Sequence, residues 1–290
     1  MQTATPERSI PQASNRIAAA RHADPFLHAA PLGRIGTLEV RLARSEDEIA
    51  AAQEVRFQVF YDELGARQNL LHTLEKRDAD RFDDICDHLL VFDSALPGPP
   101  HRQIVGTYRL LRQEAATAAG GFYSDDEYEV GKLIARHPGQ RFLELGRSCV
   151  LPAYRSKRTI EVLWQGIWAY VNRYGIDVMS GCASFHGTDP TVHAEALSFL
   201  ARTCRATAEW DVRAVAGRYQ PMDLLRDRPV NAKAALAAMP PLIKGYLRLG
   251  AKIGDGCVID HDFGTVDVFM IMPVEQIAQR YVSYYGAEAA

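Results

Sequence analysis

The pattern of apolar and polar residues near the start of the chain predicts a strand at 38–42 and then a helix. Ser45 and Glu48 have the spacing of a capping box, in which two side chains satisfy free amides at a helix start. A buried helix face is predicted by apolar residues at helical spacing, namely Ile49, Ala52, Val59 and Phe60. Arg56 falls on the same face. It either has a buried partner or ligand, because an unpaired buried charge is costly, or extends to the helix edge.

The most informative apolar stretch is 142–151, which predicts a central strand interrupted only by Glu144 and Arg147. A carboxylate is rarely buried without a partner, and burial raises its pKa whereas a nearby arginine lowers it. Glu144 is therefore either half of a structural ion pair with Arg147 or a proton acceptor for catalysis. Residues three apart face opposite sides of a regular strand, so a direct pair requires a β-bulge. Such bulges are common beside active sites.

The clearest amphipathic helix follows a short cationic loop and ends at Gly175, a favourable C-cap. Its predicted buried face consists of Ile160, Leu163, Trp164, Ile167, Trp168 and Val171. The loop places Arg155, Lys157 and Arg158 at the helix start, where free amides and cations together bind anions. The alternative is an ordinary solvated run of charges. The position directly after the Glu144 strand favours an anion site.

The rest of the pattern predicts further elements on both sides of this segment. They are a hairpin of strands at 88–93 and 104–111, a short helix opened by a Ser124–Glu127 capping box, a strand at 176–185, a helix from Asp189, strands at 213–216 and 257–272, and a closing helix after Pro273. This order predicts an α/β fold with a mixed, mostly antiparallel central sheet flanked by helices. We expect a flexible lead-in over residues 1–36 and a single domain over residues 37–290, with an irregular elaboration at 218–256.

Two further polar features have both a chemical and a structural interpretation. His186 follows the strand that should diverge from the central one, where it either lines an acyl tunnel or occupies a turn. Asp260, His261 and Asp262 resemble a metal-ligand cluster, but a single turn seldom supplies a full ligand set. We therefore favour a solvated turn and expect no metal.

Composition narrows the classes of function. The chain has 290 residues, of which 47% are hydrophobic and 24% charged, as in globular proteins, and its net charge of −3 offers no general field for nucleic acid. Five scattered cysteines fit neither a disulfide framework nor a zinc site and indicate a reducing, cytoplasmic compartment. No apolar run reaches the roughly 20 residues that a transmembrane helix needs. Any membrane association is therefore expected to be transient and peripheral, at the inner face of the membrane.

The strand, acidic residue, cationic loop and amphipathic helix at 141–175 resemble the acyl-donor site of the GNAT acyltransferase superfamily. The usual loop of that superfamily is Arg/Gln-x-x-Gly-x-Gly/Ala, whose glycines let backbone amides surround the diphosphate of coenzyme A. Arg155 matches the first position, whereas Arg158 and Ile160 replace both small residues. This departure points away from coenzyme A. The phosphopantetheine of an acyl carrier protein has a single phosphodiester, for which a glycine-lined loop is dispensable.

Three longer runs resemble the ornithine Nα-acyltransferases, a hemolysin-like branch of the GNAT-fold proteins. They are VRFQVFYDELG (55–65), ELGRSCVLPAYRSKRTIEVLWQGIW (144–168) and PPLIKGYLRLGA (240–251). The resemblance covers about residues 38–286 and implies a GNAT-like fold with an extra C-terminal elaboration. It further implies that a 3-hydroxy fatty acyl group passes from acyl carrier protein to the α-amine of L-ornithine, giving lyso-ornithine lipid, with no bound cofactor.

Acyl-homoserine lactone synthases, which also use acyl carrier protein, provide a second resemblance. The shared positions are Arg56, Phe60, Asp84, Asp87, Arg109, Glu144 and Arg147. As a hypothesis for catalysis, Glu144 accepts the amine proton, and backbone amides near Gly146 to Ser148 donate to the thioester oxygen. Arg147 and Ser148 are predicted to belong to the catalytic site with Glu144. Acceptor binding is expected from Arg56, Phe60, Asp84, Asp87, Arg109 and His186. Docking of the acidic carrier protein is expected from Arg155, Lys157 and Arg158.

Two other classes of function stay open. One is an acyltransferase for another amino acid or an acyl-homoserine lactone-type synthase, which product analysis by mass spectrometry would separate. The other is a non-catalytic module that binds acyl carrier protein. The presence of both Glu144 and Arg147 argues against the second class.

Overall fold

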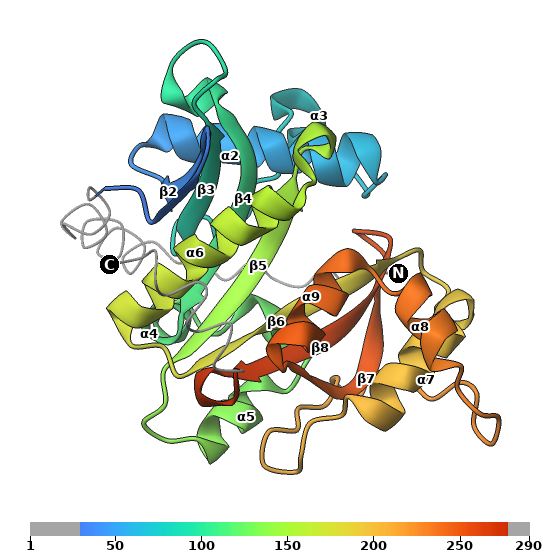
Figure 1. Cartoon of the computed structure of the whole chain (residues 1–290). Helices are drawn as coiled ribbons and strands as arrows, with labels where there is room; N and C mark the ends of the chain where they lie inside the picture. The colour runs from blue at the N-terminus through green and yellow to red at the C-terminus, as the bar shows by residue number, and fades with distance from the viewer. Residues whose placement is uncertain (1–29, 278–290) are drawn as a thin grey trace.

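Eight strands form one sheet in the computed structural model, which describes residues 30–277 (Figure 1). In chain order they are β1 (Gly33–Ile35), β2 (Leu38–Leu42), β3 (Asp87–Asp93), β4 (Ile104–Arg112), β5 (Phe142–Val150), β6 (Val178–His186), β7 (Lys252–Asp260) and β8 (Thr265–Pro273). Their order across the sheet is β1-β2-β3-β4-β5-β6-β8-β7, and among these neighbours only β5 and β6 run parallel. The predicted α/β fold with a mixed, mostly antiparallel sheet is confirmed.

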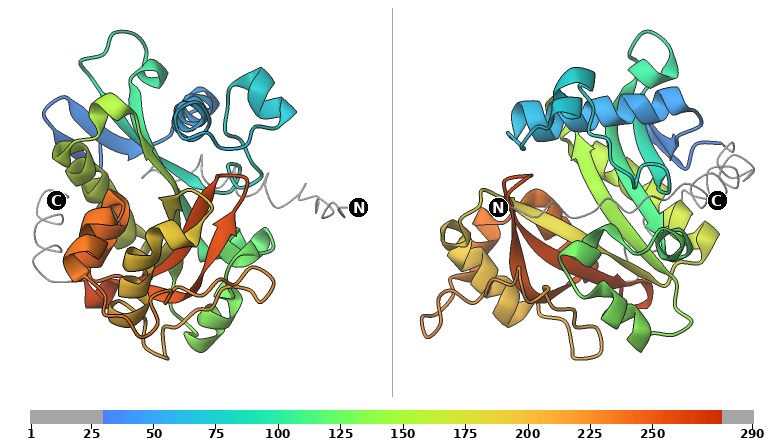
Figure 2. Two further views of the ribbon diagram at one scale, coloured as in Figure 1. Left: turned by 90° about the vertical axis from the view of Figure 1, so that its right-hand side faces the viewer. Right: turned by 180° about the vertical axis from the view of Figure 1, so that it is seen from behind.

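Helices cover both faces of the sheet. They are α2 (Glu46–Phe57), α3 (Leu70–Glu75), α4 (Gln113–Ala118), α5 (Val130–Arg136), α6 (Lys157–Tyr174), α7 (Ala194–Thr203), α8 (Ala232–Ala238) and α9 (Pro241–Leu249). Helix α6 lies on one face against β1, β2 and β3, and α2 lies on the opposite face against β3, β4 and β5 (Figure 1; Figure 2). The ring of Trp164 in α6 meets the ring of Tyr246 in α9 edge-on at 6.0 Å, so α9 lies on the α6 side.

Helix α6 is fixed by caps at both ends and by its apolar face. The hydroxyl of Ser156 accepts the Thr159 amide at 3.3 Å, and Gly175 ends the helix with a φ of 58°. The predicted face is buried except for Ile160, which is 49% exposed. The buried face begins at Thr159 instead, because Thr159 and Leu163 are one helical turn apart.

The first helix begins as predicted and then changes form. The hydroxyl of Ser45 accepts the Glu48 amide at 3.3 Å. The Glu48 carboxylate does not return to Ser45, as a full capping box requires. It accepts the Arg44 amide at 2.8 Å and pairs with Arg41 at 2.7 Å. After α2 the chain continues as a π-helix over Gln58–Glu63, a form often found at functional sites.

Two local predictions are corrected by long-range contacts. Ser124 and Glu127 do not form a capping box. Instead Tyr123–Asp126 is a 3-10 turn, and the Ser124 hydroxyl donates to Glu144 on β5. The predicted strand at 213–216 is reduced to isolated bridges to segments far away in the chain.

The ends of the predicted domain also differ from expectation. Sheet structure begins at β1, before Thr37, and the 218–256 segment contains α8, α9 and the start of β7. The predicted closing helix after Pro273 starts as a 3-10 turn over Val274–Gln276, and its remainder lies outside the described residues. Within residues 30–277 no helix has both the length and the apolar character needed to cross a bilayer.

Candidate active site

The candidate active site is a cavity at the place where β5 and β6 separate. These parallel strands pair at three positions, the last of which joins Glu144 to Ser180. Gly181 follows with a φ of 151°, and a Cβ at this position would lie 2.4 Å from the carbonyl oxygen of Leu145. The two backbones approach this closely because Gly181 has no side chain. Beyond it the strands pair no further.

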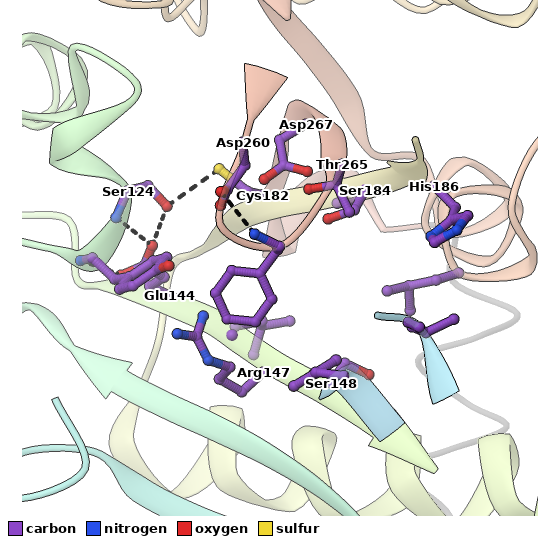
Figure 3. A pocket seen from close by; sticks show the side chains of 18 residues that line it. Ser124, Glu144, Arg147, Ser148, Cys182, Ser184, His186, Asp260, Thr265 and Asp267 are labelled. Atoms are coloured by element: carbon purple, nitrogen blue, oxygen red, sulfur yellow. Dashed lines mark hydrogen bonds between the residues drawn. The ribbon is translucent and has the colours of Figure 1, made fainter. Parts of the chain in front are cut away.

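The cavity has a volume of about 240 Å³ and takes its walls from both halves of the sheet (Figure 3). Its lining comes from β5, β6, the Tyr123–Asp126 turn, the end of the π-helix, α9 and the β7–β8 hairpin. Two predicted acceptor-site residues lie here. His186 is exposed at one end of the cavity, and Phe60 meets the ring of Phe263 edge-on at 5.7 Å.

Glu144 lines this cavity and is only 4% exposed. Its carboxylate accepts the Tyr123 amide at 2.8 Å, the Ser124 amide at 3.0 Å, and the Ser124 hydroxyl. Burial raises the pKa of Glu144 above its ordinary value, and these hydrogen bonds oppose the rise. Among the described residues Glu144 has no ion pair with Arg147. The geometry therefore favours the proton-acceptor interpretation over the structural pair.

A β-bulge is present at Arg147, although the direct pair with Glu144 for which the sequence required it does not form among the described residues. Between Gly146 and Cys149, β5 has one residue more than the paired segment of β4. Arg147 has a φ of 49°, in the left-handed region. The extra residue brings Arg147 to the same side of β5 as Glu144, since both contact Tyr123. The guanidinium lies 4.7 Å from the Tyr123 ring, and Glu144 accepts the Tyr123 amide.

Arg56 has a buried partner and does not extend to the helix edge. It is 0% exposed, and its guanidinium lies 2.8 Å from both Asp78 and Asp83. Burial raises the pKa of Asp78, but Arg147, Arg56 and Arg109 more than offset this, so the pKa is lowered. The aspartate is thus a fixed negative charge. Arg56 does not line the cavity but belongs to this buried network of ion pairs.

Arg109 and Arg147 complete the network through a third aspartate. Arg109 lies 2.5 Å from Asp80, and Arg147 lies 3.1 Å from both Asp80 and Asp78. Arg109 is 2% exposed and, like Arg56, does not line the cavity. These ion pairs of three arginines with three aspartates connect four parts of the chain. The four parts are helix α2, the loop that precedes β3, strand β4 and the bulge in β5.

The two acidic residues predicted to bind the acceptor, Asp84 and Asp87, do not belong to this network. Asp84 is exposed. Asp87 is buried on the α6 side, where it accepts the Tyr170 hydroxyl at 2.6 Å and lies 3.6 Å from Arg112. Neither lines the cavity. The sequence could not show this because the loop before β3 contains several closely spaced aspartates. The path of the loop decides which of them contact the arginines.

Ser148 lines the cavity just beyond the bulge. The hydroxyl of Tyr108 forms hydrogen bonds with Ser148 and, at 3.0 Å, with Tyr246 of α9. Pairing of β5 with β6 ends at Glu144. Backbone groups of Gly146–Ser148 on that edge of β5 consequently border the cavity, as the predicted oxyanion donors require.

The three cations of the loop have different surroundings: Arg155 is held in a salt bridge, whereas Lys157 and Arg158 are exposed to solvent. Both terminal nitrogens of Arg155 lie 2.6 Å from the Glu63 carboxylate, which ties the end of the π-helix to the end of β5. The side chain of Lys157 is 89% exposed and 3.3 Å from Glu161, and Arg158 is exposed. Of the three predicted docking cations, Lys157 and Arg158 are directed to solvent.

A carboxylate cluster that we did not predict lies on the β7–β8 side of the cavity. One oxygen each of Glu127, Asp260 and Asp267 lies within 4.8 Å of the others, and Asp260 and Asp267 line the cavity. Burial raises the pKa of Glu127 to about 7, and repulsion from Asp267 adds to this. Burial likewise raises the pKa of Asp267 to about 6. Such an oxygen set suits a cation, either an ammonium group or a metal ion.

The turn at 260–262 is partly exposed to solvent and partly in the cavity. His261 and Asp262 are exposed, and one Asp260 oxygen accepts the amides of Asp262 at 2.8 Å and Phe263 at 3.0 Å, as a turn requires. Asp260 nevertheless also belongs to the cavity. The signal for its neighbour was present in the sequence, because Asp267 is a lone carboxylate in an apolar strand, as Glu144 is.

Comparison with known proteins gives consistent results. The model of the acetyltransferase (GNAT) domain family matches residues 55–165. An L-ornithine N(alpha)-acyltransferase from Brucella abortus (strain 2308) is 65% identical over 258 residues, which cover 89% of this chain and 92% of the relative. Proteins of the same name from Agrobacterium fabrum and Rhodobacter capsulatus are 58% and 39% identical, each over 89% of this chain and over 88% and 96% of the relative. Among solved structures, an N-acyl amino acid synthase from uncultured soil microbes has a TM-score of 0.48 at 11% identity, over 83% of this chain and 96% of that one.

Proposed function

Because this chain belongs to the family of the L-ornithine Nα-acyltransferases and has a GNAT-type fold, we propose that it acylates the α-amine of L-ornithine. The group transferred is a 3-hydroxy fatty acyl group on the phosphopantetheine of acyl carrier protein, and the product is lyso-ornithine lipid. The observation that carries the proposal is the buried carboxylate of Glu144 at the point where β5 and β6 separate and open a cavity. The thioester already activates the acyl group, so the transfer requires no further cofactor.

Glu144 accepts the proton that the attacking amine loses. Only a neutral amine attacks a thioester, and a carboxyl group with a raised pKa is suited to proton transfer near neutral pH. The Ser124 hydroxyl, which donates to Glu144, is the mobile donor among its three hydrogen-bond partners. As the carbon–nitrogen bond forms, an amine proton moves to the Ser124 oxygen and the Ser124 proton moves to Glu144. The carbon–sulfur bond then breaks, and the departing thiolate takes up the proton held by Glu144, which returns the carboxylate to its starting state.

The bulged part of β5 stabilises the negative oxygen that develops on the thioester carbonyl. Backbone amides of Gly146–Ser148 act as its donors, in the manner of an oxyanion hole. Arg147 keeps the bulge in place, since its guanidinium lies between the rings of Tyr123 and Phe263 at 4.7 and 4.4 Å and is paired with aspartates behind it. Holding both substrates beside these groups supplies much of the rate acceleration.

The donor docks at the start of α6. Carrier proteins are acidic, and the exposed cations Lys157 and Arg158 provide a complementary local charge. Arg155, held by Glu63, shapes the adjoining end of β5. All five cysteines are free, which supports a reducing compartment, and we place the reaction in the cytoplasm, with transient contact at the inner face of the membrane.

The variant Glu144→Gln tests the proposal, because it keeps the shape of the side chain and removes its capacity to take a proton. We expect turnover of a long-chain acyl carrier protein thioester with L-ornithine to fall by about 10² to 10⁴, the usual contribution of a general base. Thermal unfolding and circular dichroism should show a folded protein. The matched control is Glu209→Gln, an exposed carboxylate outside the cavity, which should keep full turnover.

Two results would contradict different parts of the proposal. Unchanged turnover in Glu144→Gln removes the assigned proton acceptor. A wild-type enzyme that acylates another amino acid from a panel, and not L-ornithine, removes the assigned acceptor while leaving the role of Glu144 intact. Mass spectrometry of the products distinguishes these cases.

A further inference from the structure

We infer that Glu127, Asp260 and Asp267 form the subsite for the side-chain ammonium of the acceptor, and thereby select a diamino acid over an uncharged amino acid of the same shape. The inference rests on the proposed function, which leaves open how the enzyme distinguishes its acceptor. One oxygen of each carboxylate lies within 4.8 Å of the others. Asp260 and Asp267 line the cavity on the side opposite β5 (Figure 3), and Glu127 is buried next to them without lining it.

The cluster is connected to the proposed proton acceptor by a short chain of contacts. The Cys182 thiol on β6 lies 3.2 Å from the Glu127 carboxylate and 3.6 Å from the Ser124 hydroxyl, which in turn donates to Glu144. The two nitrogens of a 2,5-diamino acid are on the order of 6 Å apart when its side chain is extended. One acceptor molecule can therefore place its α-amine near Ser124 and Glu144 and its other amine at the cluster.

Asp267 has hydrogen-bonding capacity that the protein does not use. It is 6% exposed, and its Oδ1 atom is buried without a hydrogen bond of normal geometry from any described residue. The hydroxyls of Ser184 and Thr265 are close enough to lower the pKa of Asp267, but neither bonds to its Oδ1 atom with normal geometry. All three residues line the cavity. A buried acceptor left unsatisfied is costly, so the Oδ1 atom of Asp267 indicates a donor that arrives with the ligand.

The charge of the cluster is also unbalanced. The cation paired with it among the described residues is Arg218, whose guanidinium lies 3.1 Å from Glu127. Three carboxylates facing one guanidinium leave an excess of negative charge in a buried place, which is reflected in the raised pKa of Glu127 and of Asp267. A bound cation would remove this repulsion and restore both groups to the ionised state.

The hydrogen-bonding capacity that remains on the carboxylate oxygens matches an ammonium group better than a divalent metal. One oxygen of Asp260 already accepts two backbone amides, and both oxygens of Glu127 have partners, Arg218 and Cys182. Calcium takes six to eight oxygen ligands and magnesium six, so a divalent metal here would depend on water for most of its first shell. A primary ammonium has three N–H donors, one for each carboxylate.

The test compares L-ornithine with L-norleucine, in which a methyl group replaces the ammonium, in the full-length enzyme with the acyl carrier protein thioester. Asp267→Asn should raise the KM for L-ornithine by about tenfold to a hundredfold, the range for a hydrogen bond to a charged group. Its kcat/KM for L-norleucine should stay the same or rise, so that the preference for L-ornithine collapses. The control Asp262→Asn changes an exposed carboxylate of the same hairpin and should keep the wild-type preference. Asp260→Asn provides a second cluster variant if Asp267→Asn unfolds.

The possible outcomes separate the inference from the proposed function. A wild-type enzyme that prefers L-lysine, with that preference lost in Asp267→Asn, overturns the assignment of ornithine and upholds the ammonium subsite. Unchanged preference in both cluster variants overturns the subsite even if L-ornithine is the acceptor. Loss of wild-type activity in a chelator, restored by Mg²⁺ or Ca²⁺, identifies the cluster as a metal site and also overturns it.

Discussion

At the scale of single residues, the carboxylates around the cavity differ in protonation because their neighbours differ. Asp78 is surrounded by arginines, which hold its pKa low against the effect of burial. Glu144 meets amides and a hydroxyl, and burial keeps its pKa above the ordinary value. Carboxylates thus supply a fixed charge in the network and, in the proposed function, a proton acceptor at the cavity, a separation of roles that enzymes commonly obtain from environment.

The cluster carboxylate Asp267 provides a pH-dependent test of this view. Its folded-state pKa of about 6 lies above the ordinary value of 3.8, so between these pH values the folded protein binds more protons than the unfolded chain. The free energy of unfolding should therefore fall as pH rises through this window, by about 2 to 3 kcal/mol from this group. Urea unfolding without ligand at pH values below and above the window should show a flatter dependence for Asp267→Asn. An identical slope for Asp267→Asn and wild type would exclude a raised pKa, and Asp262→Asn should retain the wild-type slope.

At the scale of elements, the two strands that separate each depend on an unusual backbone position. On β5, Arg147 adopts the left-handed conformation, which costs on the order of 1 to 3 kcal/mol in a residue with a side chain. Its ion pairs with Asp78 and Asp80 and its contacts with two aromatic rings offset this cost. On β6, Gly181 permits the close approach that ends the pairing. The cavity is therefore a consequence of how these two strands are built.

Replacing Gly181 by alanine should disturb this point of separation. The added Cβ would lie 2.4 Å from the Leu145 carbonyl oxygen, at a φ of 151° that side chains disfavour. We expect the free energy of unfolding to fall by about 2 kcal/mol or more, with reduced turnover because β6 moves away from Glu144. Gly131→Ala on α5 is the control, since its Cβ would meet nothing within 4 Å. Equal stability of the two variants, measured in urea, would contradict the argument.

These elements also show what the sequence could and could not predict. The β5 strand and helix α6 were predictable because each follows from the local spacing of apolar residues, whereas the bulge was expected only for a direct pair of Glu144 with Arg147. The partners of Arg56 and Arg109 were not, because they depend on the path of the loop before β3. The pairing of Ser124 with Glu144 likewise arises from a contact between distant segments, which overrides the local capping pattern.

At the scale of the whole molecule, the charges that would attract the two proposed substrates lie in different places. The net charge is −3, yet the exposed cations Lys157 and Arg158 are together at the start of α6. The excess negative charge of the carboxylate cluster is inside the cavity, on the β7–β8 side. If the proposed function holds, an acidic carrier protein and a cationic acceptor are attracted to separate sites. Screening limits each attraction to about 8 Å at physiological salt, so local charge matters more than the net value.

Reversal of the α6 charges tests this separation directly. The double variant Lys157→Glu/Arg158→Glu should weaken binding of acyl carrier protein by about tenfold at low salt, because both cations face the acidic partner. The difference from wild type should shrink as salt is raised from about 50 mM to about 500 mM, measured by titration calorimetry.

The control Lys132→Glu/Lys252→Glu makes the same change in net charge on α5 and at the start of β7, where both side chains are exposed. If this control loses as much affinity, the effect comes from net charge and not from the α6 site. If neither variant loses affinity, the carrier docks elsewhere on the molecule. The KM for L-ornithine should stay unchanged in both variants, since the charges that attract the acceptor lie inside the cavity and are not altered.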